Sequence, residues 1–338
     1  MARVSYPPMT GARTPVGRGS PPALLFDRRV LVVSGKGGTG KTTVAAVCAM
    51  AAARTGKRVL LADVEGREGP AGLLGLPAPG FAERETPFGF RMLSVTPREA
   101  LGEYLRLFFH MGALARSLER ARVLSTATES IPGFRDLVTA GKLYELTQWR
   151  DRSRDARRTP YDIVVVDAPP TGQLLAFLRG PSGFRDLIRM GRPARQLAGI
   201  DRLLRDQSRL VLVCIPEDMA VEETLETASE LQAESLPFTA TVANQIHPAP
   251  FPRGTRATAL RLSPQGLARS AKGAGIPLSA ATAKEVLHAA STWDARVRAE
   301  LSRLRQLQGA GPVIELPFLY APAFGPSQVS RLADVLVA

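Results

Sequence analysis

From residue 30 to residue 43 the chain reads Val30-Leu31-Val32-Val33-Ser34-Gly35-Lys36-Gly37-Gly38-Thr39-Gly40-Lys41-Thr42-Thr43. A short apolar run leads into a glycine-rich loop, and an alanine-rich segment follows the loop. The loop satisfies the pattern G-x-x-x-x-G-K-[ST], in which backbone N–H groups surround the phosphates of a nucleotide. A strand before this pattern and a helix after it let those N–H groups point together at an anion. The passage therefore predicts a nucleotide-phosphate site between a buried strand and a helix.

The side chains of the loop predict ATP and Mg²⁺ as ligands. Glycine lets the main chain approach the phosphates because no Cβ stands in the way. Lys41 is expected to reach the β- and γ-phosphates, and the Thr42 hydroxyl is expected to bind Mg²⁺. A glycine-rich turn without any ligand is the alternative interpretation. The predicted phosphate-binding residues are Gly35, Gly37, Gly38, Thr39, Gly40, Lys41, Thr42 and Thr43.

Further apolar runs predict the fold class. Short runs rich in Val, Ile and Leu that end near Gly, Pro or Asp are typical of buried parallel strands. Such runs occur at residues 30–33, 59–62, 163–166, 210–214, 239–242 and 313–316, and helical segments alternate with them. The alternation predicts an α/β fold with a doubly wound, mostly parallel sheet, as in P-loop NTPases. A closing helix is expected from Ser327, with its apolar residues packed on the sheet rather than on a membrane.

The remaining segments suggest how the chain is divided. The block from residue 98 to residue 155 contains no strand pattern, and its apolar residues recur at helical spacing. We therefore predict an ATPase core at residues 28–97 and 156–338, and a helical subdomain at residues 98–155 together with 174–204. The apolar stripe around Phe108 and Phe109 is interpreted as core rather than as a client site. Residues 1–27 are rich in Pro, Gly and Arg and are expected to form a disordered basic arm.

Carboxylates follow two of the predicted strands. Asp167 follows the run at residues 163–166, and Asp63 and Glu65 follow the run at residues 59–62. Asp167 is expected to hold water on Mg²⁺; of the other two carboxylates, one is expected to do the same and the other to orient the attacking water. The predicted metal set is Thr42, Asp167 and Asp63, and the predicted catalytic set is Lys36, Lys41, Glu65 and Asp63. One of the three carboxylates can instead be a plain cap or turn residue.

Charge and cysteine usage narrow the range of partners. The formal net charge is +13, but lysine is scarce and the arginines are scattered among Asp and Glu. This pattern argues against a nucleic-acid partner, which needs clustered basic residues. Cys48 and Cys214 lie in separate apolar runs, which favours buried thiols and a cytoplasmic location. No apolar run reaches the roughly 18 residues that a membrane span requires.

Several strings resemble one family of ATPases. Lys36 completes the string K-G-G-x-G-K-[ST], which resembles the deviant Walker A loop. The string Asp167-Ala168-Pro169-Pro170-Thr171-Gly172 resembles a D-T-A-P-T-G switch II, and residues 96–104 resemble the segment that follows switch I. Together these strings are similar to the arsenical-pump ATPase family, which includes the ATPase that escorts tail-anchored membrane proteins. The resemblance covers residues 28–338.

The resemblance implies an ATP-hydrolysing dimeric switch that couples ATP binding and hydrolysis to the handling of a protein client. Lys36 would cross to the phosphates held by a second subunit, in a homodimer or in a heterodimer with a paralogue. Asn244 resembles the strand-end asparagine that hydrogen-bonds adenine, and Pro317 and Phe318 lie where a late loop packs on the base. A turn asparagine is the alternative for Asn244.

Three departures from the family pattern leave other functions open. Glu65-Gly66 stands where the family has Asp-Pro, which predicts slow hydrolysis or a regulatory or scaffold subunit that binds ATP with little turnover. The chain has neither the C-x-x-C of a zinc-bridged dimer nor three thiols for trivalent arsenic, so arsenite transport is not expected. A partition-type positioning ATPase, which would bind DNA or membrane through a basic patch, is the last alternative.

Overall fold

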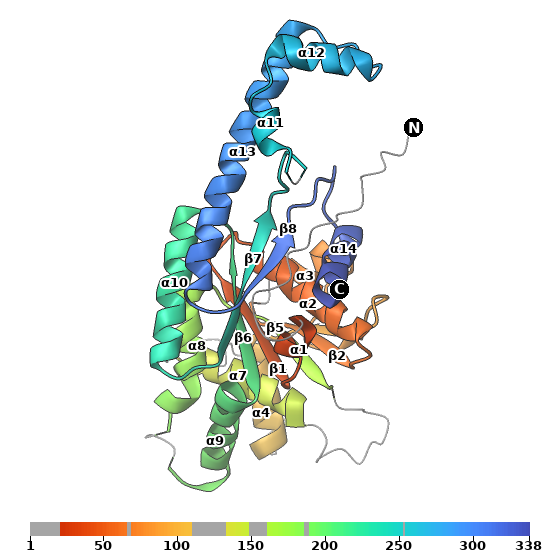
Figure 1. Cartoon of the computed structure of the whole chain (residues 1–338). Helices are drawn as coiled ribbons and strands as arrows, with labels where there is room; N and C mark the ends of the chain where they lie inside the picture. Colours follow the sequence, from red (N-terminus) through yellow and green to blue (C-terminus); the bar gives the residue numbers. More distant parts are fainter. Residues whose placement is uncertain (1–20, 66–68, 110–132, 149–160, 186–188, 253) are drawn as a thin grey trace.

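The computed structural model describes residues 21–65, 69–109, 133–148, 161–185, 189–252 and 254–338 (Figure 1). Within these residues eight strands form one sheet in the order β3-β4-β2-β5-β1-β6-β7-β8. Neighbouring strands are parallel, except that β3 and β4 are antiparallel. The strands are β1 (Val30–Gly35), β2 (Val59–Asp63), β3 (Arg84–Glu85), β4 (Arg91–Ser94), β5 (Ile163–Asp167), β6 (Ser208–Cys214), β7 (Phe238–Ile246) and β8 (Val313–Pro317).

All six predicted apolar runs lie in strands of this sheet, which confirms the predicted α/β fold. Both faces of the central strands are buried. Val30 and Val32 belong to one buried cluster, and Leu31 and Val33 belong to the other. This alternation follows from the pleat of a strand that helices cover on both sides.

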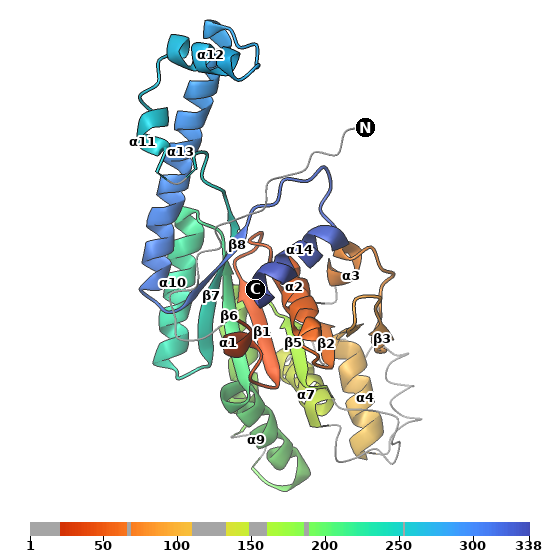
Figure 2. The ribbon, with the colours of Figure 1, turned by 45° about the vertical axis from the view of Figure 1, so that its right-hand side comes forward.

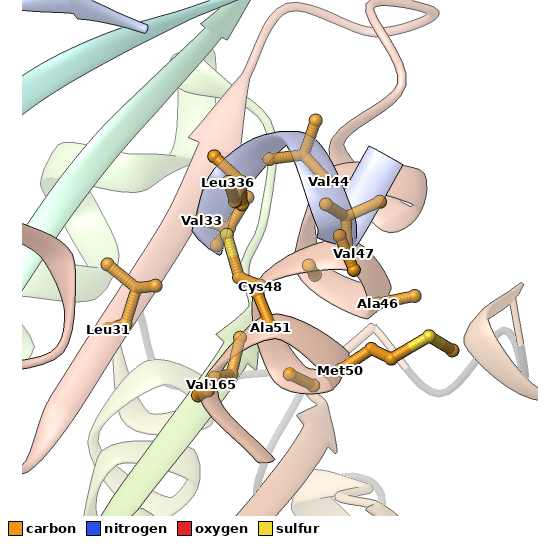
Figure 3. Packing of buried hydrophobic residues seen from close by; sticks show 14 of the residues in the cluster. Leu31, Val33, Val44, Ala46, Val47, Cys48, Met50, Ala51, Val165 and Leu336 are labelled. Atoms are coloured by element: carbon orange, nitrogen blue, oxygen red, sulfur yellow. The ribbon is translucent and has the colours of Figure 1, made fainter. Parts of the chain in front are cut away.

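One face of the sheet is covered by α2 (Lys41–Arg54), α14 (Pro326–Val337), and the short helices α1 (Pro21–Leu25) and α3 (Gly69–Leu73). Figure 3 shows Cys48 of α2 next to Val33 of β1 and Leu336 of α14. Because the sheet covers one side of α2 and α14 covers another, α2 is apolar over most of its circumference. The prediction that the closing helix packs within the fold is confirmed.

On the other face, several longer helices of the described residues pack against the sheet. α7 (Phe134–Gln148), α8 (Thr171–Gly183), α9 (Gly191–Asp206) and α10 (Asp218–Ala233) share a buried cluster with β1, β2 and β5, and α4 (Pro97–Phe109) lies beside α7. The predicted helical subdomain falls in this layer. Residues 110–132 and 149–160 and the side chains of Phe108 and Phe109 lie outside the described part, so the subdomain boundary stays a prediction.

The predicted basic arm needs a correction at its carboxyl end. Residues 21–27 were assigned to it, but Pro21–Leu25 form α1, and Leu25 and Phe26 are buried against the core. Two large apolar side chains anchor this short segment, although the Pro- and Gly-rich composition around it is typical of disorder. Residues 1–20 lie outside the described residues.

A helical projection between β7 and β8 was not predicted. It consists of α11 (Arg256–Ala259), α12 (Pro264–Gly273) and α13 (Ala280–Gln308). Figures 1 and 2 both show α11, α12 and the first half of α13 beyond the end of the sheet at which β7 and β8 terminate. The 29 residues of α13 make a rod of about 43 Å. Its buried residues fall mostly in its second half, which packs on α10 and the sheet.

Both cysteines are free and buried, as predicted. Burial in an apolar environment raises the pKa of the Cys48 thiol to about 12 and that of the Cys214 thiol to about 11. Neither thiol is therefore ionised near neutral pH. Among the helices that the structure describes, none combines the length and the apolar character needed to span a bilayer.

Candidate nucleotide site

The loop between β1 and α2 passes close to β6 and β7. At each of these two close approaches the loop has a glycine, because a Cβ would not fit there. Gly35 has a φ of 154°, and a Cβ there would lie 2.2 Å from the Val213 carbonyl oxygen of β6. Gly40 has a φ of 91°, and a Cβ there would lie 2.5 Å from Asn244 Nδ2. Between them the Thr39 hydroxyl donates to the Lys36 carbonyl oxygen over 2.8 Å and closes the loop. The loop therefore takes a path that requires glycine at both positions, and phosphate binding by its amides stays a prediction.

A hydrogen bond joins the start of α2 to the end of β5. Thr42 Oγ1 donates to Asp167 Oδ2 over 2.8 Å. The sheet register explains the meeting, because Val33 of β1 pairs with Asp167 and Thr42 begins the helix just beyond β1. Burial raises the pKa of Asp167 to about 7, and the nearby Asp63 adds to the shift, while the Thr42 hydrogen bond and Lys41 oppose it. The carboxylate is thus buried without enough positive charge around it.

Asp63 ends β2 and pairs in register with Asp167 of β5. Its side chain is buried; Oδ1 accepts from the Glu65 N–H over 3.0 Å, and the Ser94 hydroxyl lies 3.4 Å from Oδ2. Gly66 and the two residues after it lie outside the described part of the chain, which resumes at Gly69. A Cβ at Gly69 would lie 3.2 Å from Thr42 Cγ2, so the segment after β2 returns to the phosphate loop.

These residues fit a magnesium ion. The Thr42 hydroxyl and the Asp167 and Asp63 carboxylates supply only oxygen, the ligand that Mg²⁺ prefers. A cation beside Asp167 would also favour the ionised form of that carboxylate, which burial alone disfavours. Thr42, Asp167 and Asp63 would hold the ion or the water bound to it.

The segment at residues 167–172, which resembles switch II and is called the switch II loop below, is tied to β1 by Ser34, which the sequence analysis did not predict. The Ser34 hydroxyl donates to the Pro169 carbonyl oxygen over 2.5 Å, and the Ala168 N–H donates to the Val33 carbonyl oxygen over 3.0 Å. Ser34 is fully buried. The available signal was a hydroxyl at the end of an otherwise apolar strand, where a buried polar group needs a partner.

Lys36 forms an ion pair within its own chain. Its Nζ lies 3.0 Å from Glu223 Oε2 on α10, and both side chains are about one-third exposed. The Thr171 hydroxyl, at the end of the switch II loop, donates to the other oxygen of Glu223. Sequence reasoning missed Glu223, because it is one of several glutamates in α10 and nothing local distinguishes it.

The residues expected to hold the base lie at the ends of β7 and β8. Asn244 is buried, and its Nδ2 donates to the Thr39 carbonyl oxygen over 2.9 Å. The Phe318 N–H, next to Pro317, donates to the Ile246 carbonyl oxygen over 2.8 Å. The His247 ring stacks on Phe318 at 4.8 Å, and His247 Nδ1 lies 2.7 Å from Glu300 Oε1. The structure brings Asn244 onto the phosphate loop; its contact with adenine stays a prediction.

All the predicted site residues lie at or just beyond the carboxyl ends of parallel strands. We call this side of the sheet the carboxyl edge, formed by the ends of β2, β5, β1, β6, β7 and β8. Ligands of open α/β sheets bind at this edge, because loops and helix amino termini converge there. The arrangement suits binding of a nucleoside triphosphate.

Residues 30–249 match the family model of the CobQ/CobB/MinD/ParA nucleotide binding domain. The match begins with β1 and ends just after β7, so it contains the phosphate loop, Asp63, Asp167 and Asn244.

Individual relatives agree with that match. ATPase BagA of Mycobacterium tuberculosis is 35% identical over 258 residues, which cover 75% of this chain and 72% of the relative. ATPase GET3 of Kluyveromyces lactis is 25% identical over 262 residues, covering 67% and 74% of the two chains. A protein of Aquifex aeolicus named for the arsenical pump-driving ATPases is 23% identical over 250 residues, covering 65% and 81%. These relatives match the family whose strings the sequence resembles.

Replacing Gly40 by Ala is expected to destabilise the nucleotide-free chain by about 1–3 kcal/mol, because the new Cβ meets a left-handed φ and the Asn244 amide. The matched control is Gly37→Ala in the same loop, where a Cβ would meet no atom within 4 Å. Urea unfolding at equilibrium measures both changes. Equal losses in the two variants would contradict the role given to Gly40.

Proposed function

The chain belongs to the CobQ/CobB/MinD/ParA nucleotide-binding family, and we propose that it is an ATP-hydrolysing dimeric switch that couples its ATP cycle to the handling of a protein client. The observation that carries the proposal is the bond between Thr42 and Asp167, which joins the phosphate loop to the switch II loop. Through this hydrogen bond, binding of the γ-phosphate at the loop can change the conformation of the switch II loop. Relatives named as ATPases support ATP as the nucleotide.

The phosphate loop and the three carboxylates of the carboxyl edge have proposed tasks in hydrolysis. The amides of the loop and Lys41 bind the phosphates and balance the charge that develops during phosphoryl transfer. Bound Mg²⁺ supplies further positive charge to the phosphates, and Thr42, Asp167 and Asp63 would hold it. Glu65 would orient the attacking water, because catalysis of this reaction depends mainly on positioning.

Pairing of two subunits is proposed from Lys36. Lys36 belongs to the same loop as Lys41, and its side chain extends to α10 rather than to Asp167. In a pair that meets at the carboxyl edges, Lys36 of each subunit would reach the phosphates held by the other. The partner is a second copy or a paralogue.

The second candidate is a regulatory or scaffold subunit that binds ATP and hydrolyses little of it. It is favoured by Glu65-Gly66, since a longer side chain on a more flexible backbone holds a water less firmly than a fixed Asp-Pro. Turnover by the purified chain alone distinguishes the two functions. Hydrolysis that begins only after a paralogue is added would favour the second.

Lys41→Ala is expected to lower ATP turnover by about 100-fold or more, because the charge that faces the β- and γ-phosphates is lost. Phosphate release in Mg²⁺ and ATP measures it. Lys272→Ala on the exposed part of α12 is the control and is expected to leave turnover unchanged. Undiminished turnover by Lys41→Ala would rule out hydrolysis at this loop.

Lys36→Ala is expected to abolish ATP-dependent pairing and to leave ATP binding to the single chain within about threefold, because Lys36 acts on the partner's nucleotide. Light scattering after size exclusion, with a non-hydrolysable ATP analogue, reports the mass of the assembly. Pairing of the variant at wild-type concentrations would contradict a role for Lys36 across the interface.

Glu65→Gln in ATP is expected to accumulate the ATP-bound state, because the variant retains the phosphate loop but loses the carboxylate that orients water. A protein client should be recovered with this form and not with Lys41→Ala, and mass spectrometry identifies it. Recovery of the same proteins with both forms would contradict coupling between the ATP cycle and client handling.

A further inference from the structure

Glu223 is the one described carboxylate on α10 whose contacts join both loops of the site. One oxygen lies 3.0 Å from Lys36 Nζ in the phosphate loop, and the other accepts from Thr171 at the end of the switch II loop. Thr171 is buried, whereas the ion pair is partly open to solvent. A buried hydroxyl therefore fixes one side of the carboxylate, and the lysine on the other side can leave it.

The groups around Glu223 favour the ionised form of its carboxylate. Its pKa is lowered mainly by the Thr171 hydrogen bond and further by Lys36, and burial opposes the shift only in part. In the chain without a partner, this carboxylate is the anion that Lys36 faces. A nucleotide phosphate carries more negative charge than a carboxylate, so the two anions compete for one ammonium group.

We propose that Glu223 is a positioning residue for Lys36: it holds the ammonium group at the carboxyl edge of an unpaired subunit and links it, through Thr171, to the switch II loop. This inference rests on the proposed pairing of subunits across ATP. Lys36 leaves Glu223 when the partner's phosphates arrive, and the side chain that Thr171 holds then loses its cationic neighbour. Formation of the pair is thereby sensed at the segment that begins with Asp167.

The proposal predicts that loss of the Glu223 charge favours pairing. Two such ion pairs break for each pair of subunits, and a partly exposed ion pair shifts an equilibrium by about 1.5- to 5-fold, so Glu223→Gln should tighten pairing by about 2- to 30-fold. Thr171→Val keeps both charges but releases the carboxylate, and it should tighten pairing by a smaller factor.

Sedimentation velocity over a range of protein concentrations, with a non-hydrolysable ATP analogue, measures the dissociation constant of the pair. Glu222→Gln is the matched control: it removes the same charge from the neighbouring residue of α10, which is exposed. Its dissociation constant should stay within twofold of the wild-type value, as should the ATP affinity of each single chain.

The outcomes separate this inference from the function on which it rests. If wild-type chain pairs with the analogue but Glu223→Gln pairs no more tightly, the role of Glu223 is overturned and the proposed pairing stands. Equal tightening by Glu222→Gln would also overturn it, since general electrostatics would then explain the effect. If the wild-type chain and all variants stay single, with or without a paralogue, the proposed pairing falls and the inference falls with it.

Discussion

The passage of the main chain from β1 into α2 is the constraint on which the site depends. β1 lies between β5 and β6, so the loop that leaves it runs against both neighbours. Gly35 meets the main chain of Val213 in β6 so closely that no side chain fits, and Gly40 meets the side-chain amide of Asn244. These close approaches set the path of the loop and therefore the place of Thr42 beside Asp167. The path of the loop is therefore set by the main chain of β6 on one side and by the Asn244 amide on the other, and Thr42 takes its position from that path.

Polar side chains of the site contact other groups of the chain. Asp167 accepts from Thr42, Asn244 donates to Thr39, and Glu223 faces Lys36. The ionised form is favoured at one of these carboxylates and disfavoured at another. Burial raises the pKa of Asp167 to about 7, whereas the pKa of Glu223 is lowered, mainly by its hydrogen bond from Thr171. Positive charge is thus lacking around Asp167, where a metal ion would supply it. On α10, Glu223 supplies a negative charge with which phosphates would compete for Lys36.

The sequence predicted the features that are written in consecutive residues. The apolar runs predicted the strands of the central sheet, and the glycine loop predicted where β1 passes into α2. It did not predict Ser34 or Glu223, because their partners come from segments distant in the sequence and only the register of the sheet brings them near. Nor did it predict the projection between β7 and β8: the first half of α13 extends beyond the sheet, and most of the buried residues of this helix fall in its second half. The sequence also placed Leu25 and Phe26 in a disordered arm, because the apolar run at residues 23–26 is short and follows a Pro- and Gly-rich segment.

The family match ends at residue 249, where the chain leaves the sheet to form the projection, yet the projection is not separate from the site. One carboxylate oxygen of Glu300 in α13 accepts from the backbone N–H of His247, and the other lies within hydrogen-bond distance of its ring Nδ1. The His247 ring stacks on Phe318 in the loop expected to hold the base. Trp293, one turn farther from the sheet than Val297, packs edge-on against the same histidine ring. The middle of α13, from Trp293 to Glu300, therefore packs with the ends of β7 and β8 as one unit. Because tightly packed interiors move as units rather than deform continuously, the orientation of the projection is set by the same residues that would form the wall of the base pocket.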